Sequence, residues 1–321
     1  MAVPFILRSE IGEKDQGRKL GDFVRSELQL SRRAIKAIKF KGGTFLINGV
    51  PQHVNYILSE GDQLEAHFPP EEISKTLTPE DLPLDIVYED AFALIINKEA
   101  GIPTIPSYQH FNGTLANGVV NYLLQKGESG ASHPVTRLDR ETSGLVLMAK
   151  HGHVHDLFSR LQKERGIHRR YLAVVHGELT DQFGTINAPI GRKEGSIIER
   201  CVTEEGKPAL THYEVLCKME NATVVGIKLE TGRTHQIRVH FSSIGHPLLG
   251  DDLYGGTKME ITRQALHARH LYFPHPLINE TVFCTAPIPY DIRSLIENAD
   301  GGMDAIHRWD RKIKSDYSDS Y

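Results

Sequence analysis

Residues 133–150 read HPVTRLDRETSGLVLMAK, a short polar segment that runs directly into an apolar strand. Asp139 stands in this segment between Arg137 and Arg140. Aspartate is favoured in turns and at the starts of helices, so a lone Asp139 is better explained by turn formation than by chemistry. The choice between a structural and a catalytic aspartate therefore depends on residues elsewhere in the chain.

The length and composition favour a globular protein of two domains. A chain of 321 residues exceeds the size at which one hydrophobic core keeps growing, which favours a large domain and a smaller one. Apolar residues make up 40% and charged residues 24%, and no segment approaches the ~18 consecutive apolar residues of a membrane span. The N-terminus, MAVPFILR, does not have the pattern of a secretory signal. We expect a cytoplasmic monomer without a membrane partner.

Cysteine and histidine usage predicts neither a disulfide framework nor a metal site. The 3 cysteines are widely spaced and form no Cys-x-x-Cys pair, so we expect them to be packing residues. Three histidines form the motif His151-Gly-His153-Val-His155. Spacings of two and four residues on a helix do not bring three imidazoles to one face, so the motif predicts no metal. A nucleotide-binding loop is also absent from the sequence, and we expect no cofactor.

The charge is distributed unevenly along the chain, although the total is only −4. Residues 17–41 contain eight basic and two acidic side chains, a balance of +6. Residues 71–90 contain seven acidic side chains and one lysine, a balance of −6. Local charge steers binding to polyanions more than total charge does. The basic segment is therefore a candidate for binding nucleic acid, and the alternative is a helix face that merely meets solvent.

The first 70 residues have the pattern of a small α+β module. Apolar residues recur at helical spacing over residues 18–28, and Ser31 is a suitable N-cap for a second helix. Strands are predicted over residues 44–47 and 63–68. The second helix carries four basic residues on the side away from its apolar positions, namely Arg32, Arg33, Lys36 and Lys39.

An acidic, proline-containing segment, residues 71–84, predicts an extended linker to a second domain over residues 85–298. The second domain alternates strand and helix patterns. Strands are expected over residues 92–97, 145–149, 170–175, 223–229 and 282–286, and helices over 115–125, 153–164 and from Thr234 to Gly245. Residues 264–273 form an amphipathic segment, and the polar C-terminal tail, residues 299–321, predicts no regular structure.

Ordered motifs make each domain similar to a known family. The first domain resembles the small S-four-like RNA-binding module, through Arg18-x-Leu20, Ser31-Arg32, Gly43 to Asn48-Gly49, and Gly61-Asp62. The second resembles the catalytic domain of the RluA-type RNA pseudouridine synthases. Its motifs are Asn97-Lys98, Arg137-Leu-Asp139-x-x-Thr142-Ser-Gly-Leu, Tyr171-Leu-Ala, Thr231-Gly-Arg233-Thr-His-Gln-Ile-Arg, Gly250-Asp251 and His267-Ala. One departure is Glu99, where many relatives have proline.

The resemblance implies a fold and a reaction. The fold would be α+β, with the S-four-like module followed by a mixed, largely antiparallel sheet. The reaction would break the bond from ribose to a uracil nitrogen, turn the base and rejoin the sugar to a ring carbon, without cofactor or metal. Asp139 would be the essential carboxylate, and it could act as nucleophile, as base or as charge stabiliser.

Other residue roles carry over by position. Tyr171 would stack on the uracil ring and could help remove the proton from the ring carbon. Arg233 would pair with Asp139, holding it ionised and oriented. Arg137 would bind RNA beside the site and fill the gap left by the flipped nucleotide. The secondary candidates are Lys98, His235 and Arg238.

The implied partner is RNA, with phosphates contacted by the basic residues of the second helix. A module of this kind within this family suggests ribosomal RNA of the large subunit, and transfer RNA is the alternative substrate. One rival is a non-catalytic RNA-binding or ribosome-assembly factor that has kept the fold. Retention of Asp139, Tyr171 and Arg233 argues against it, because binding alone requires none of the three as a set. A nucleoside glycosidase is disfavoured because no second catalytic carboxylate is evident.

Overall fold

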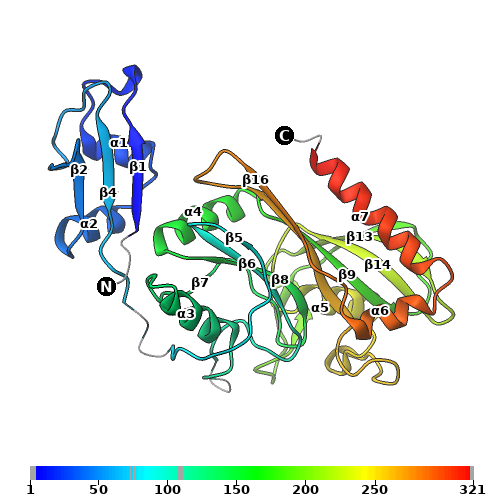
Figure 1. Ribbon diagram of the computed structural model, residues 1–321. Helices are drawn as coiled ribbons and strands as arrows, with labels where there is room; N and C mark the ends of the chain where they lie inside the picture. Colours follow the sequence, from blue (N-terminus) through cyan, green and yellow to red (C-terminus); the bar gives the residue numbers. More distant parts are fainter. Residues whose placement is uncertain (1–4, 73, 75–76, 108–110, 319–321) are drawn as a thin grey trace.

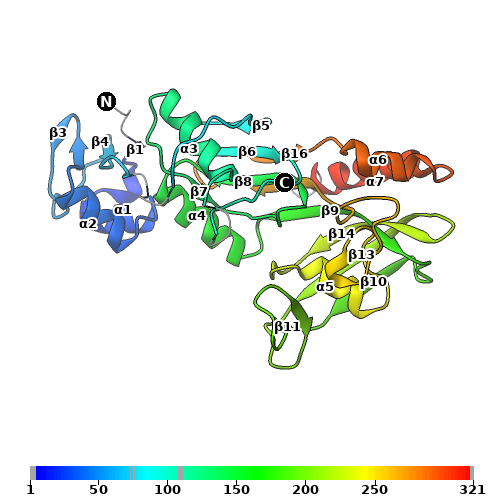
Figure 2. The same cartoon turned by 90° about the horizontal axis from the view of Figure 1, so that it is seen from below.

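The computed structural model describes residues 5–72, 74, 77–107 and 111–318. It has a small N-terminal part and a large part built on a long twisted sheet (Figure 1). Viewed from below, the small part lies at one end of the large sheet, next to α4 (Gly152–Lys163) (Figure 2). The chain is therefore arranged as two neighbouring units with separate sheets.

The small part packs two helices against a four-stranded sheet. Its elements are β1 (Ile6–Glu10), the 3-10 turn η1 (Glu13–Asp15), α1 (Leu20–Ser26), α2 (Arg32–Phe40), β2 (Thr44–Ile47), β3 (Val50–Pro51) and β4 (Gln63–His67). The strand order is β1-β4-β2-β3. Ser31 caps α2 as predicted, because its hydroxyl accepts a hydrogen bond from the amide of Ala34 at 3.1 Å. Ile35 and Ile38 bury one face of α2, which leaves its basic face outside.

The large part is built on one ten-stranded sheet. The strands are β5 (Ile86–Glu89), β6 (Ala93–Lys98), β7 (His133–Pro134), β8 (Ser143–Ala149), β9 (His168–His176), β10 (Phe183–Asn187), β13 (Leu210–Lys218), β14 (Ala222–Leu229), β15 (Leu266–Pro274) and β16 (Thr281–Thr285). The main path is β10-β13-β14-β9-β15-β8-β6-β5, and a separate hairpin joins β11 (Ile190–Arg192) to β12 (Arg200–Val202). Among the described strands only β15 and β8 pair in parallel, so the prediction of a mixed, largely antiparallel sheet is confirmed.

The two faces of the large sheet are covered by different helices. One face carries α3 (Leu115–Gln125) and α5 (Gln236–Ser243), which join one apolar cluster. The other face carries α4, α6 (Tyr290–Glu297) and α7 (Gly302–Ser318). Successive residues of a strand point to opposite faces, so Val225 packs on the first cluster and Val224 on the second side.

The C-terminal segment forms a helix, and the expectation of an unstructured tail was wrong. Helix α7 buries Ile306, Trp309 and Ile313, while most of its other positions are polar. Trp309 lies over Gly226 of β14, where a β-carbon would be 2.6 Å from the indole. Three large apolar residues in a polar segment give too weak a periodic signal to identify a helix, which here depends on packing against the sheet.

The histidine motif at the start of α4 packs against the small part. The ring of Phe5 stacks on His151, with centroids 4.2 Å apart. Phe68 stacks on His153, with centroids 5.5 Å apart. Both histidines are at least 95% buried. The motif therefore joins the two parts of the molecule.

The described residues of the segment 71–84 lie along the large part. Glu71 accepts a hydrogen bond from the amide of Gly152, at the first residue of α4, at 2.9 Å. Leu82 packs on Gly118 of α3, where a β-carbon would be 3.1 Å from the leucine. These described residues form no helix or strand, which is expected because prolines disfavour both. Their contacts hold them on the large part.

Candidate active site

A pocket lies where four segments of the large part meet. The loop between β7 and β8 contributes Asp139, and the strand β9 contributes Tyr171. The connection from β14 into α5 contributes further polar side chains, and β15 contributes Leu266. The predicted residues that line this pocket are Arg137, Asp139, Tyr171, Arg233, His235 and Arg238. Motifs far apart in the sequence thus meet at one place.

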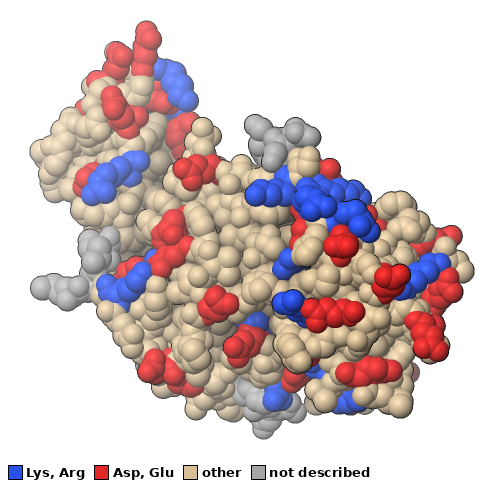
Figure 3. Space-filling view, turned by 45° about the vertical axis from the view of Figure 1, so that its right-hand side comes forward, with Lys and Arg blue, Asp and Glu red and all other residues tan. Residues whose placement is uncertain are grey.

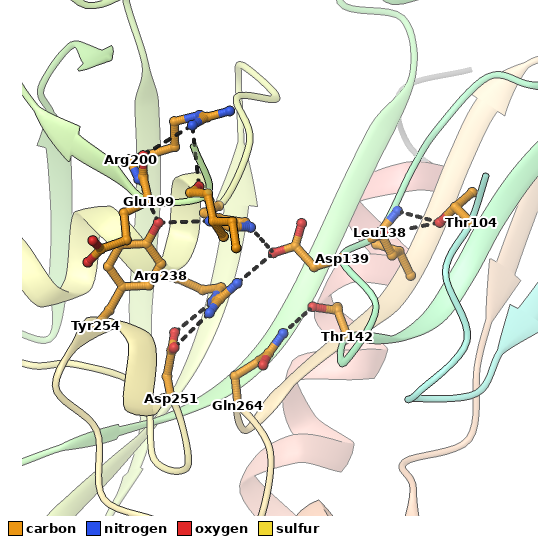
Figure 4. Close-up of polar contacts among 12 residues, drawn as sticks. Thr104, Leu138, Asp139, Thr142, Glu199, Arg200, Arg238, Asp251, Tyr254 and Gln264 are labelled. Atoms are coloured by element: carbon orange, nitrogen blue, oxygen red, sulfur yellow. Dashed lines mark hydrogen bonds and ion pairs between the residues drawn. The ribbon is translucent and has the colours of Figure 1, made fainter. Parts of the chain in front are cut away.

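The carboxylate of Asp139 is held by Arg238 (Figure 4). Nη1 of Arg238 donates to Oδ2 of Asp139 at 3.2 Å. Nε and Nη2 of the same guanidinium donate to the two carboxylate oxygens of Asp251 at 2.7 and 2.8 Å. The side chain of Asp139 is 28% exposed, whereas those of Arg238 and Asp251 are 8% and 0% exposed. The buried pair fixes the cation, and the cation orients the accessible carboxylate.

The charge of Arg238 is secured by its two carboxylate neighbours. Burial by itself lowers the pKa of this guanidinium, but the hydrogen bonds and charges of Asp251 and Asp139 outweigh burial and raise the pKa above its usual value. The Arg238 guanidinium also lies over the ring of Tyr254, with its central carbon 4.9 Å from the centroid. Arg238 is therefore a permanent, immobile positive charge beside Asp139.

The prediction that Arg233 pairs with Asp139 was wrong. Arg233 lines the pocket, but its Nε donates to the carbonyl of Pro208 at 3.0 Å. Arg238, a secondary candidate, takes the place predicted for it. Both arginines belong to one motif, and only the path of the backbone into α5 shows which of them faces the carboxylate.

Helix α5 begins at Gln236, after His235, so the predicted helix start at Thr234 was two residues too early. His235 has a left-handed backbone with a φ of 56°, a conformation that is uncommon outside glycine and is often found at functional sites. Oε1 of Gln236 closes the turn by accepting from the backbone amide three residues earlier at 2.9 Å. His235 points both ring nitrogens at polar partners: Nδ1 lies 2.7 Å from the hydroxyl of Tyr254, and Nε2 lies 3.8 Å from Oδ2 of Asp139.

Tyr171 lies on the buried side of the pocket and is 4% exposed. It stands in the centre of the sheet, because β9 pairs there with Ile227 of β14 and Ala268 of β15. Burial raises the pKa of the Tyr171 phenol, so the phenol is neutral at physiological pH. Arg169 lies on the same strand against Gly232, where a β-carbon would be 3.1 Å from Nη2. This glycine leaves room for the arginine in the pocket.

Arg137 and Lys98 differ in accessibility. Arg137 is exposed and lines the pocket, between the buried residues Thr136 and Leu138. Lys98 is 1% exposed, and its Nζ donates to three backbone carbonyls. Arg137 is therefore open to a large partner, whereas Lys98 belongs to the interior.

Comparisons with known proteins identify the family. Residues 93–243 match the model of the RNA pseudouridylate synthase family. The sequence is 51% identical to an uncharacterized RNA pseudouridine synthase of Bacillus subtilis, YjbO, over 84% of this chain and 96% of that protein. The chain belongs to the RluA-type RNA pseudouridine synthases. It is therefore an isomerase that acts on RNA.

The chain is also similar to a relative named for its RNA substrate and to a solved structure. The synthase is 36% identical to the ribosomal large subunit pseudouridine synthase D of Buchnera aphidicola, over 87% of this chain and 94% of that protein. The solved structure of human RNA pseudouridylate synthase domain containing 1 is similar, with a TM-score of 0.56 and 28% identity over 71% of this chain and 91% of that chain. The catalytic fold is therefore shared with an experimentally determined relative.

Asp251 and Tyr254, which contact the pocket residues Arg238 and His235, were not among the predicted site residues. Asp251 holds Arg238, and Tyr254 contacts His235 and also accepts from the amide of Arg200 at 2.9 Å. A signal for the first was present, since Gly250-Asp251 is one of the family motifs. An aspartate after a glycine is typical of a turn, so its role in the site becomes visible only when its partner is known.

The predicted RNA-binding residues of the synthase fall into two groups. Arg137 lies at the pocket, whereas the four basic residues of α2 are exposed on the small part. Figure 3 shows a further group of basic side chains beside the end of α7 and a mixture of charges over the rest of that face. The exposed basic residues of α7 are Arg308, Arg311, Lys312 and Lys314. Positive charge is therefore local, as the uneven sequence pattern indicated.

Neither a metal cluster nor a membrane helix is found in the described part of the synthase. Within it, no group of three or more His, Cys, Asp or Glu side chains is placed to hold a metal ion. The described helices also include none with the length and apolar character needed to cross a bilayer.

Proposed function

We propose that this synthase isomerises specific uridines of large-subunit ribosomal RNA, with Asp139 as the catalytic carboxylate acting on a nucleotide flipped out of its helix. The observation that carries the proposal is an accessible carboxylate, held by the buried Arg238–Asp251 pair, in a pocket that also contains Tyr171. Relatives named ribosomal large subunit pseudouridine synthase D support the choice of RNA. We propose that the enzyme works as a monomer in the cytoplasm.

The reaction needs only one carboxylate. The bond from C1′ of ribose to N1 of uracil breaks, a bond from C1′ to C5 forms, C5 loses a proton and N1 gains one. Cleavage builds positive charge on the sugar, and Asp139 can stabilise that charge, capture the sugar, or take a sugar proton. Arg238 keeps the carboxylate in place through each of these routes. Because the base is returned to the sugar, no second carboxylate is required to activate water.

Tyr171 is better suited to stacking than to proton removal. Burial raises the pKa of its phenol, so the ring is neutral when the uracil enters. A neutral aromatic ring provides a stacking surface for a flipped base, whose unstacking costs a few kcal/mol. Action as a base would first require the phenol to lose its proton. We therefore assign Tyr171 to holding the base while it turns.

RNA is held at two distant places. The exposed side chains Arg32, Arg33, Lys36 and Lys39 of α2 contact phosphates, in the manner of the S-four-like module that the first 70 residues resemble. Arg137 contacts RNA at the pocket and occupies the gap left by the flipped nucleotide. The first contact supplies affinity, and the second supports base flipping.

Tritium release tests this proposal. Transcripts of ribosomal and transfer RNA labelled at C5 of uridine are incubated with the wild type, with Asp139→Ala, and with Asp156→Ala as a matched control on the exposed side of α4. We expect release from ribosomal RNA by the wild type and the control, and none by Asp139→Ala. Release from transfer RNA alone would replace the proposed substrate, and equal release by Asp139→Ala would remove this residue from catalysis.

A further inference from the structure

The residue before Asp139 is held by a threonine from a distant segment. The hydroxyl of Thr104 accepts a hydrogen bond from the amide of Leu138 at 3.1 Å and donates one to the carbonyl of the same residue at 2.9 Å (Figure 4). Thr104 is 3% exposed, and Leu138 is 9% exposed. One buried hydroxyl therefore fixes both backbone polar groups of Leu138, the residue that precedes the catalytic aspartate.

The residue after Asp139 is held by the same segment, residues 98–104. Nζ of Lys98 donates to the carbonyl oxygens of Glu99, Ile102 and Arg140 at 2.7, 2.8 and 3.1 Å. The amide of Gly101 donates to the carbonyl of Arg140 at 2.9 Å, and Nε of Arg140 donates to the carbonyl of Gly101 at 3.0 Å. Glu99 contributes its carbonyl, which any residue supplies, so the loss of the family's proline leaves these contacts available.

The buried position of Lys98 shows that residues 98–104 pack closely against the catalytic loop, which is the loop between β7 and β8 that carries Asp139. Burial lowers the pKa of Lys98 to about 7, and the three carbonyl acceptors match the three protons of the ammonium group. Gly101 has a φ of 88°, a conformation that glycine adopts without strain. The turn at Gly101 lets lysine and backbone amide converge on one carbonyl of the loop.

The far side of the catalytic loop is held by residues just before β15. Nη1 of Arg263 donates to the carbonyl of Glu141 at 3.0 Å, while its Nε and Nη2 are paired with Asp291 of α6 at 2.6 and 2.9 Å. Nε2 of Gln264 donates to the hydroxyl of Thr142 at 3.2 Å (Figure 4). The loop is therefore anchored on both sides, and Asp139 projects from between the anchors.

We propose that Thr104 is a positioning residue of the active site, which holds the backbone of Leu138 so that the Asp139 carboxylate stands at the distance from the sugar that the reaction requires. Thr104 lies 35 residues before Asp139, and its hydroxyl acts on the pocket through Leu138, which lines it. A displacement of about 1 Å of a reacting group can cost ~100-fold in rate, so a small relaxation of this loop is sufficient to impair catalysis. The proposal rests on the catalytic role proposed for Asp139.

The experiment compares Thr104→Val with Thr104→Ser and with a matched control, Thr223→Val. Thr223 is 0% exposed, and its hydroxyl likewise bonds one backbone carbonyl and one backbone amide: it donates to the carbonyl of Gly177 at 2.8 Å and accepts from the amide of Leu179 at 3.2 Å. Valine removes the hydroxyl with little change in shape, and serine restores it. Steady-state tritium release from labelled ribosomal RNA gives kcat and KM for each variant, and thermal unfolding gives its stability.

We expect Thr104→Val to lower kcat by ~10- to 100-fold with KM within about threefold of the wild type, because substrate contacts remain while the carboxylate is displaced. Thr104→Ser should recover most of kcat. Thr223→Val should lose comparable stability yet keep the wild-type kcat. Equal kcat for Thr104→Val and Thr223→Val, or no recovery with serine, would overturn the positioning role.

An Asp139→Ala arm separates this inference from the proposed function. If Asp139→Ala is inactive and Thr104→Val is fully active, Thr104 has no positioning role and the role of Asp139 stands. If Asp139→Ala is active, the role proposed for the aspartate fails, and the positioning role fails with it. A lowered kcat for Thr104→Val together with an inactive Asp139→Ala supports both.

Discussion

The pocket and the outer face of α2 both use arginine, but in the pocket the charge is buried and paired, whereas on α2 it meets solvent. Arg238 is 8% exposed at its side chain and makes three hydrogen bonds to carboxylates. Arg32 and Arg33 of α2 are exposed. A buried, paired charge keeps one geometry, which chemistry requires, while an exposed charge moves freely and is screened by salt. The arginine side chain therefore has a fixed geometry in the pocket, whereas on α2 it can adjust its position to an oppositely charged partner.

The energetic consequences of the two arrangements are opposite. Removing one partner of a buried ion pair leaves an uncompensated charge, which costs about 3–5 kcal/mol. Removing an exposed charge usually changes the free energy of unfolding by less than about 0.5 kcal/mol. Mutations in the pocket should therefore affect folding and catalysis together, whereas mutations on α2 should affect only RNA binding.

The largest effect is expected for Arg238→Met. The change leaves Asp251, whose side chain is 0% exposed, without its cation, and it leaves Asp139 without its anchor. We expect a loss of about 3–5 kcal/mol in the free energy of unfolding and a loss of tritium release. Chemical denaturation and the release assay measure the two effects.

A double variant separates the two losses. Arg238→Met combined with Asp251→Asn removes the stranded charge, so most of the stability should return while activity stays low. Recovery of activity in the double variant would show that Asp139 does not need the Arg238 guanidinium. Arg238→Lys should also have low activity, because a lysine has no planar group that can donate to both oxygens of Asp251 and to Asp139.

The contrast between the two regions also explains what the sequence could predict. Amphipathic spacing and an N-cap are local signals, and the basic face of α2 follows from them. Ser31 caps the helix as predicted, and Ile35 and Ile38 bury the side opposite the basic residues. The position of Asp139 in a pocket required the family resemblance, because a lone aspartate before a strand is ambiguous. Local sequence patterns therefore predicted the exposed face of α2 better than they predicted the buried site.

The errors arose where tertiary geometry decides between similar residues. Arg233 and Arg238 have the same chemistry and lie five positions apart, and the left-handed backbone at His235 determines which of them turns toward Asp139. Thr104 and Asp251 are small polar residues in loops, a setting in which turn formation is the usual explanation. Their partners lie 34 and 13 residues away, at separations that periodicity does not address.

An intermediate effect is expected at the junction of the two parts, where His153 packs on Phe68. Burial lowers the pKa of His153 to about 4 from its usual 6.5, so below pH 6.5 the unfolded chain binds a proton that the folded chain does not. Stability should therefore fall as the pH decreases from 6.5 toward 4, by about 2 kcal/mol at pH 5 from this group. His153→Phe should remove that part of the loss.

Chemical denaturation at pH 7 and pH 5 measures the contribution of His153 to the pH dependence of stability. His53→Phe is the control, because His53 is exposed on the small part. The difference in unfolding free energy between the two pH values should shrink in His153→Phe and stay unchanged in His53→Phe. An unchanged difference in both variants would mean that His153 becomes accessible to protons in the folded protein, and hence that the two parts separate readily.

The smallest effect is expected for Lys36→Ala on α2. Its side chain is exposed, so the free energy of unfolding and kcat at saturating RNA should stay at wild-type values. Loss of one phosphate contact should reduce the slope of log affinity against log salt concentration by about 1, and weaken binding by a similar amount for every RNA sequence. Filter binding of ribosomal RNA over a salt series measures the slope, with Arg311→Ala on α7 as the control. An equal change in both variants would mean that RNA senses the positive charge of the whole surface. A change confined to Lys36→Ala would mean that α2 forms a defined contact with the RNA. The exposed charges of α2 would then become ordered on binding RNA, whereas the buried charges of the pocket are already ordered in the free protein.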